Sequence, residues 1–272
     1  MRGFFKNKGS IFVLIFIIVC FICLTISIVN IMKWNIDKNK TQDTIDKIKD
    51  ETMITEIVDD YKTKVIQSDD KKTNPYFDYI NMNMIDVDFQ KLKNINNEVK
   101  GWIQVNGTNV NYPFVQHEDN KFYLTHSIDK SYNSAGWLFL DYRNNIDNLD
   151  KNTIIYAHGR LDETMFGSLK NVLNDSWLNN TDNYVIKLAT EKENSLWQIF
   201  SVYHIPTTND YIKTVFNNEN EWNQFIKTIT ERSFFNFNTT ITNDDKILTL
   251  STCYNDREKM VIHAKLIKRR TK

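Results

Sequence analysis

The sequence predicts a mostly β fold of the α+β class, built as an antiparallel barrel or a sandwich. Three observations predict it. Short connections rich in Asn, Asp and Gly separate the candidate strands, and two helical patterns, at 164–175 and 218–233, interrupt their succession. Many short strands with short connections are typical of barrels and sandwiches. The third observation is a series of runs rich in β-branched and aromatic residues: VNYPFVQ, GWLFLDY, NTIIYAHG, NYVIKLAT, SLWQIFSVYHI, KILTLST and KMVIHAKLI.

A helix is expected just before these strands, in the segment DVDFQKLKNINNEVKGWIQV at 86–105. Its apolar residues Phe89, Leu92 and Ile95 recur at the three-residue spacing that places them on one helical face. We expect this helix to end near Gly101 and a strand to begin at Trp102.

The N-terminus contains a candidate membrane segment. Residues 11–32 carry no charge and approach the roughly 20 apolar residues that a transmembrane helix needs. Arg2, Lys6 and Lys8 precede the segment, and positive residues stay in the cytoplasm. The sequence therefore predicts a basic cytoplasmic tail at 1–10, an anchor at 11–32 and an extracellular remainder. A cleaved signal peptide is the alternative, although the apolar run is long for one.

Residues 33–74 are predicted to form an extracellular helical stalk. The segment is rich in charge and has apolar residues at near-helical spacing until SDDKKTNP at 68–75. A solvated spacer is an equally reasonable interpretation of its first half. The main domain is then expected to span 75–272. The apolar residues of the stalk are Ile45, Ile48, Met53, Ile57, Val58, Tyr61 and Val65.

Charge and cysteine content restrict the function. The chain has 34 basic and 34 acidic residues, and this balance gives no indication of a nucleic-acid partner. Cys20 and Cys23 lie in the predicted anchor, where cysteine serves as small apolar filler. Cys253 is the only cysteine beyond residue 23, so the outer domain cannot form an internal disulfide. A lone thiol in an oxidising exterior is a candidate reactive group.

Cys253 and His158 each follow a predicted strand at the point where a loop begins. A thiol becomes a good nucleophile when a histidine or a cation favours its thiolate form. The alternatives are a buried structural thiol and a histidine that only ends a strand. Arg257 and Lys259 follow in the next hairpin and would share one face of an extended segment, so either could stabilise an oxyanion. They could equally belong to a solvated hairpin tip.

The remaining histidines suggest no metal site. His263 alternates within a predicted strand, whereas His117 and His126 flank a polar segment that could lie on the surface. No two histidines, counting His204, show the spacing of a zinc site with cysteine or a carboxylate. We therefore expect neither a metal nor another cofactor.

Four segments, in order, resemble the sortases, membrane-anchored cysteine transpeptidases of Gram-positive bacteria. TLSTC at 249–253 is similar to the sortase cysteine signature, and IIYAHGRLDETMFGSLKNVL resembles the segment around the catalytic histidine. GWLFLDYRN and VKGWIQVNGTNVNYPFVQ resemble the class B branch. The resemblance runs from about residue 86 to 268. It implies an eight-stranded β-barrel with N-terminal helices and a helical insertion before the cysteine strand.

The resemblance also implies catalytic roles. Cys253 matches the nucleophile that attacks the threonine carbonyl of a sorting signal similar to Asn-Pro-x-Thr-x, and His158 matches the histidine that handles the protons. Class B sortases carry an arginine before the last strand. Lys259 stands at that position here, yet a guanidinium offers two hydrogen bonds and favours Arg257. Tyr254 and Asn255 replace the acidic residue sometimes proposed after the cysteine.

The resemblance further implies substrate contacts and partners. The partners would be surface proteins with a C-terminal sorting signal and an amine of a lipid-linked cell-wall precursor peptide, both at the outer membrane surface. Two alternatives stay open: a cysteine peptidase that uses water as acceptor, and a catalytically silent binding protein. The residues that match substrate-contacting positions are Asn120, Leu124, Thr207, Tyr211, Ile212 and Ser251.

Overall fold

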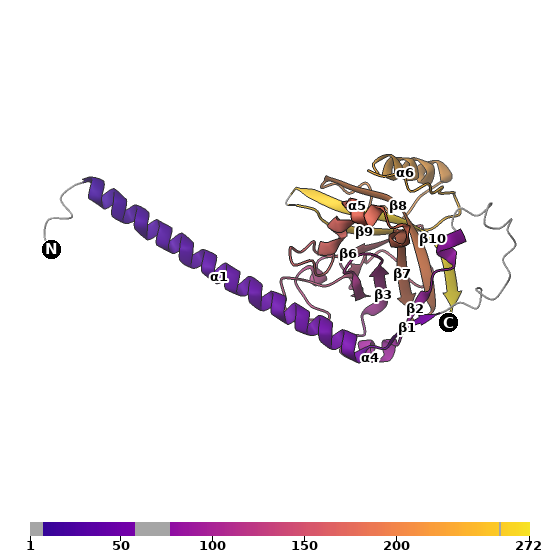
Figure 1. Cartoon of the computed structure of the whole chain (residues 1–272), viewed down its shortest axis with the longest axis horizontal. Coiled ribbons are helices and arrows are strands. Elements are labelled where there is room, and N and C mark those ends of the chain that lie inside the picture. Colours follow the sequence, from indigo (N-terminus) through magenta and orange to yellow (C-terminus); the bar gives the residue numbers. More distant parts are fainter. Residues whose placement is uncertain (1–7, 58–76, 256) are drawn as a thin grey trace. The chain divides into compact units, whose positions relative to one another are not determined.

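The computed structural model describes residues 8–57, 77–255 and 257–272. The chain divides into two compact units, one ending at Thr44 and one running from Ile45 to Lys272. Helix α1, Lys8–Glu51, provides the described part of the first unit and the start of the second (Figure 1).

The apolar segment of the first unit is helical, as predicted. Its large side chains between Ile11 and Met32 are exposed, and the helix is long and apolar enough to cross a membrane. A signal sequence near an N-terminus passes the same test. The helix is thus consistent with the predicted anchor and with a signal sequence.

The second unit is built on a closed barrel of eight described strands, in the order β10-β8-β7-β3-β4-β5-β6-β9 (Figure 1). A barrel, rather than a sandwich, is therefore the correct alternative. The predicted antiparallel arrangement is wrong for two neighbouring pairs, because β4–β5 and β6–β9 are parallel. The barrel strands are β3 (Val99–Val105), β4 (Asn111–Val115), β5 (Phe139–Leu140), β6 (Asn152–Tyr156), β7 (Val185–Thr190), β8 (Glu193–Pro206), β9 (Ile247–Cys253) and β10 (Glu258–Thr271).

The stalk prediction is wrong at its centre. Helix α1 ends at Glu51, and residues Ile54–Ile57 form strand β1, which pairs with β2, Met84–Val87. Ile54 and Ile57, at the two ends of ITEI, are spaced as on one helical face, yet the segment is a strand because its backbone pairs with β2. Ile45 and Ile48 are buried in the core of the second unit. The expected break at 68–75 and the domain boundary at 74/75 lie outside the described residues, as do Val58, Tyr61 and Val65.

The predicted helices are confirmed with altered bounds. Asn218 caps α6 by accepting a hydrogen bond from the Glu221 amide. The pattern at 164–175 forms the 3-10 helix η4, and the separate short α-helix α5 begins only at Asp175. Helix α4 stops well before Gly101, because Asn96 is extended and β3 begins at Val99. The helices that the structure describes in the second unit after α1 are α3 (Phe77–Ile80), α4 (Phe89–Ile95), η3 (Phe122–Leu124), η4 (Gly167–Leu173), α5 (Asp175–Leu178), η5 (Thr181–Tyr184) and α6 (Glu219–Glu231).

Strand β9 is buried on both faces. Leu248 and Leu250 belong to the main core, whereas Ile247 packs in a second cluster with Trp222 and Phe225 of α6. Helix α6 thus covers the outside of the barrel near β8, β9 and β10 (Figure 1). Burial on both sides fixes the strand and, with it, the residue at its end.

Candidate active site

Cys253 is the last residue of β9 and is exposed, directly after the buried Ser251 and Thr252. The strand therefore holds its backbone rigidly while the thiol faces solvent. A buried structural thiol, the alternative from sequence, does not describe this position.

His158 lies beside the cysteine because of the parallel pairing of β6 and β9. Tyr156 is opposite Ser251 in the register, so both chains advance two residues from that pair to reach His158 and Cys253. Nε2–H of His158 donates a hydrogen bond to the carbonyl oxygen of Leu124 at 2.8 Å, and this contact fixes the orientation of the ring.

Gly159 keeps the two strand ends close. A Cβ at this position would lie 2.1 Å from the carbonyl oxygen of Cys253 and 3.0 Å from Oγ1 of Thr252. Any side chain would push the end of β9 away from the histidine loop. The glycine that the sequence presents as a turn signal therefore permits a close backbone approach.

The two candidate cations occupy different positions. Lys259 is opposite Cys253 across the β9–β10 pair, and its Nζ lies 3.1 Å from Sγ. Arg257 precedes β10 and is exposed, and its main-chain carbonyl accepts a hydrogen bond from the Thr207 amide. Tyr254, in the hairpin between β9 and β10, stacks on His204 of β8, with ring centroids 4.3 Å apart.

A groove of about 400 Å³ contains these groups. All six residues predicted to contact a substrate lie in its lining. The lining comes from η3 and the loop before it, from β5, from the ends of β6 and β9, from the segment between β8 and α6, and from the start of β10. Within the described part of the chain, Lys259 belongs to this lining and Arg257 does not. The lining comprises Asn120, Leu124, Phe139, Tyr156, Ala157, His158, Thr207, Thr208, Asn209, Tyr211, Ile212, Ser251, Thr252, Cys253 and Lys259.

A model of the sortase domain matches residues 103–267 of the chain. The chain belongs to the sortase family. Sortase B of Staphylococcus aureus is 35% identical over 184 residues, covering 66% of this chain and 75% of that protein. Sortase B of Listeria monocytogenes is 33% identical over 186 residues, covering 66% and 74%. The resemblance to the class B branch is confirmed, and the chain is a sortase-type cysteine transpeptidase by homology.

Solved sortase B structures share the fold. Sortase B of Bacillus anthracis in complex with AAEK1 has a TM-score of 0.62 at 37% identity, covering 66% of this chain and 84% of that one. A substrate complex of S. aureus sortase B has a TM-score of 0.62 at 35% identity, covering 66% and 84%. A sortase B complexed with Gly3 has a TM-score of 0.62 at 34% identity, covering 66% and 85%. The implied eight-stranded sortase barrel is thus confirmed.

Sequence reasoning missed two aromatic residues of this sortase groove. Tyr156 precedes His158 by two residues in an extended segment, so alternation could have placed both on one face. Phe139 reaches the groove only because β5 pairs with β6, with Phe139 opposite Tyr156. No local sequence pattern predicts the pairing of β5 with β6.

Three other histidines, His117, His204 and His263, lie outside the groove lining. His263 is fully buried, and burial lowers its pKa from the usual 6.5 to about 3, with a smaller contribution from the Arg232 charge. His117 lies 3.2 Å from Glu98, and His204 lies 3.1 Å from Glu258. None of these three lines the groove among the residues described.

Proposed function

We propose that this sortase cleaves a sorting signal similar to Asn-Pro-x-Thr-x after the threonine and joins the new carboxyl end to an amine of a cell-wall peptide. The observation that carries the proposal is the convergence of a thiol, an imidazole and an ammonium group in one groove. The substrate complex of S. aureus sortase B and the Gly3 complex of a sortase B support a peptide signal and an amine acceptor.

The first half-reaction forms a thioester. Sγ of Cys253 gives its proton to His158 and attacks the threonine carbonyl carbon, and the resulting tetrahedral oxyanion collapses with cleavage of the peptide bond. His158 donates a proton to the departing amine. The released C-terminal fragment leaves, and the signal-bearing protein stays bound to Cys253 as a thioacyl group.

The second half-reaction reverses the proton transfer. An amine of the wall peptide attacks the thioester carbonyl and gives a proton to His158. Collapse of the second tetrahedral intermediate forms a new amide and releases the Cys253 thiolate. Water in place of the amine would give hydrolysis by the same steps.

We propose Lys259 as the cation of this site. Its ammonium lies within hydrogen-bond distance of Sγ, where it stabilises the thiolate and can follow the charge onto the oxyanion. The bidentate geometry of a guanidinium favours Arg257 instead, and its exposed position in the β9–β10 hairpin is the argument against it. Variants of both residues discriminate between the two assignments.

The groove residues Asn120, Leu124, Thr207, Tyr211, Ile212 and Ser251 are proposed to contact the signal peptide, since all line the groove beside the thiol. The partners are then surface proteins with a C-terminal signal and a lipid-linked wall precursor. The apolar helix would hold the enzyme beside both, with the N-terminus inside and the barrel outside.

The test uses the full chain in detergent micelles with an Asn-Pro-Gln-Thr-Asn peptide and triglycine, followed by mass spectrometry. The expected product carries a new Thr–Gly bond and is absent with Cys253→Ala. Hydrolysed peptide alone, in the presence of excess triglycine, would favour a peptidase. An unchanged peptide would overturn the proposed signal.

A further inference from the structure

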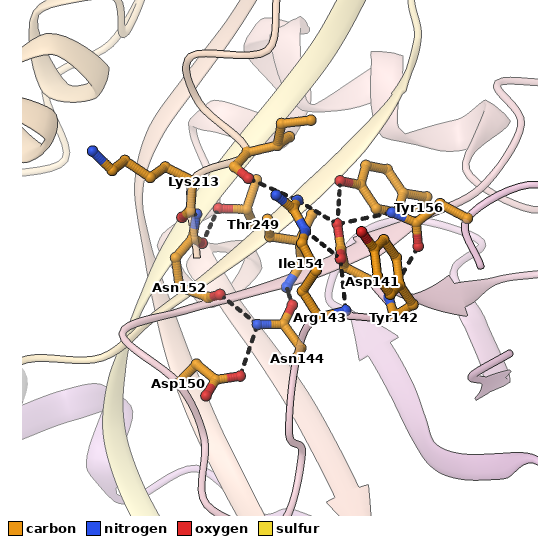
Figure 2. Close-up of polar contacts among 12 residues, drawn as sticks. Asp141, Tyr142, Arg143, Asn144, Asp150, Asn152, Ile154, Tyr156, Lys213 and Thr249 are labelled. Atoms are coloured by element: carbon orange, nitrogen blue, oxygen red, sulfur yellow. Dashed lines mark hydrogen bonds and ion pairs between the residues drawn. The ribbon is translucent and has the colours of Figure 1, made fainter. Parts of the chain in front are cut away.

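A buried carboxylate lies behind the groove without belonging to its lining. Asp141 follows β5, and its side chain has no exposed surface. Its Oδ1 accepts hydrogen bonds from Nε of Arg143, at 2.8 Å, and from the Arg143 amide, at 3.0 Å. Its Oδ2 accepts from Nη2 of Arg143 at 2.7 Å, from Nδ2 of Asn120 at 3.0 Å and from Oη of Tyr156 at 2.8 Å. Figure 2 shows the carboxylate at the centre of these contacts.

Each donor is connected to a different part of the groove wall. Asn120 and Tyr156 line the groove themselves. Nη2 of Arg143 also donates to the carbonyl oxygen of Ile212, at 2.9 Å, and Ile212 is a lining residue of the segment between β8 and α6. Asp141 and Arg143 thus join three wall segments that are far apart in sequence.

The amide of Asn120 is held at both ends. Its Nδ2 donates to Asp141, and its Oδ1 accepts from the main-chain amide of Tyr142 at 3.0 Å. This side chain therefore fixes the position of its own loop. Its contribution to substrate binding depends on where Asp141 holds it.

The charges of the network are balanced. Burial raises the pKa of Asp141, but hydrogen bonds from Arg143 and Tyr156 and the guanidinium charge outweigh it, so the pKa lies below its usual value. Burial and the Asp141 charge raise the pKa of Tyr156, which stays protonated and donates. Loss of the Arg143 guanidinium would leave the buried Asp141 carboxylate without its charged partner, which is strongly unfavourable.

A second tether holds the same wall segment. Nδ2 of Asn152 donates to the carbonyl oxygen of Lys213 at 2.9 Å (Figure 2). It also donates to the carbonyl oxygen of Tyr211, at 3.3 Å. Oδ1 of Asn152 accepts from Thr249 of β9 at 2.6 Å. The segment after β8 is therefore fastened through its main-chain carbonyls to side chains of the barrel.

We propose that Asp141 and Arg143 are positioning residues that set the width of the peptide groove and thereby the affinity for the sorting signal, without touching the substrate. The proposal rests on the proposed function, since it assigns the groove to the signal peptide. Neither residue contacts Cys253, His158 or Lys259 in the described structure. The chemistry at the thiol should therefore be affected far less than binding of the signal.

The experiment compares Asp141→Asn, Arg143→Met and Arg143→Lys in the full chain in detergent micelles. Glu193→Gln is the matched control, because Glu193 is also a buried carboxylate paired with an arginine, Arg269, outside the groove lining. Readouts are KM and kcat with the Asn-Pro-Gln-Thr-Asn peptide and triglycine, the rate of Cys253 alkylation by iodoacetamide, and amide hydrogen exchange over residues 207–213.

Asp141→Asn and Arg143→Met are expected to raise KM for the peptide about tenfold, with kcat changed less than about threefold. Alkylation of Cys253 should stay within about twofold of wild type, and exchange over 207–213 should accelerate. Arg143→Lys should fall between, because one ammonium cannot reproduce the fork that reaches both Asp141 and Ile212. Glu193→Gln should change none of these values.

Three results would overturn the proposal. The first is exchange over 207–213 that matches wild type in both variants, and the second is faster exchange with an unchanged KM. The third is equal losses in kcat and alkylation, since they indicate damage at the thiol. If wild type does not process the peptide at all, the proposed signal fails, and the exchange data still decide whether Asp141 and Arg143 hold the wall.

Discussion

Nζ of Lys259 lies 3.1 Å from Sγ of Cys253, and the two residues face each other across the β9–β10 pair. The contact is fixed by strand register rather than by a flexible loop, since Lys259 is also opposite Ile205 of β8. The backbone of Lys259 is thus fixed by pairing with both neighbouring strands, and its ammonium reaches the thiol from there. In the proposed mechanism, this ammonium is the cation within reach of the nucleophile.

Lys259→Met is expected to lower transpeptidation about 10²-fold, the usual cost of one lost oxyanion donor. It should also slow alkylation of Cys253 by iodoacetamide, because the nearby positive charge favours the thiolate. Arg257→Met should change both rates less than about threefold, as for an exposed residue outside the groove. Mass spectrometry of the ligated product and a thiol alkylation assay give the two rates.

Lys227→Met serves as the control for removing a positive charge, since Lys227 lies on α6 in an exposed pair with Glu231. A larger loss with Arg257→Met than with Lys259→Met would assign the cation to Arg257. Equal retention of activity in both variants would remove the cation from the proposed mechanism.

His158→Ala is expected to reduce product formation about 10³-fold, because the leaving amine then has no proton donor. The thioacyl enzyme should not accumulate, since its formation needs that proton. Intact-mass measurement of the enzyme after mixing with peptide detects the thioester directly. A normal yield of thioester that fails only to react with triglycine would place the role of His158 in the second half-reaction alone.

Much of this site could be predicted from local sequence. Alternation in KILTLST predicts a strand. Cys253 and His158 each follow a predicted strand where a loop begins, and a thiol and an imidazole in such positions are candidates for a catalytic pair. The parallel pairing of β6 and β9 that brings them together is non-local, and no pattern within either strand encodes it. The same limit explains the error at residues 54–57, where pairing with β2 overrides a spacing that suits a helix.

Asp141 shows a second limit of sequence reasoning. A charged residue after an apolar run predicts a solvated strand end, because ionised side chains are rarely buried alone. Its burial depends on Arg143, Asn120 and Tyr156 arriving from three places in the chain. Arg143 and Tyr156 belong to sortase-like sequence motifs, but the contacts of Asp141 with Asn120 and Tyr156 depend on closure of the barrel.

Gly159→Ala is expected to disrupt catalysis more than folding. The added Cβ would lie 2.1 Å from the Cys253 carbonyl oxygen, so the end of β9 must shift. A displacement of about 1 Å at a nucleophile can cost about 10²-fold in rate. Product formation by mass spectrometry and the melting temperature by circular dichroism measure the two effects.

Gly9→Ala is the control for Gly159→Ala, because a Cβ there meets no atom within 4 Å. Wild-type activity in Gly159→Ala would show that the close approach is not needed.

The buried network of His263 predicts a loss of stability in mild acid. Oγ1 of Thr249 donates to Asn152, so it must accept from Nδ1 of His263, at 2.8 Å. Burial lowers the pKa of His263 to about 3, so the ring is neutral in the folded protein at higher pH. With the proton on Nδ1, Nε2 accepts a hydrogen bond from Oη of Tyr203 at 2.9 Å.

Below pH 6.5 the histidine is protonated in the unfolded chain but not in the folded chain. The free energy of unfolding therefore decreases as the pH is lowered from about 6.5 to about 3. The slope approaches about 1.4 kcal/mol per pH unit, or about 2 kcal/mol between pH 6.5 and 5. Thermal melts of wild type and His263→Gln at both pH values measure it. The variant should be less stable at pH 6.5, because it loses packing, but should lose less stability on acidification. Parallel losses in the two proteins would show that groups other than His263 control the acid response.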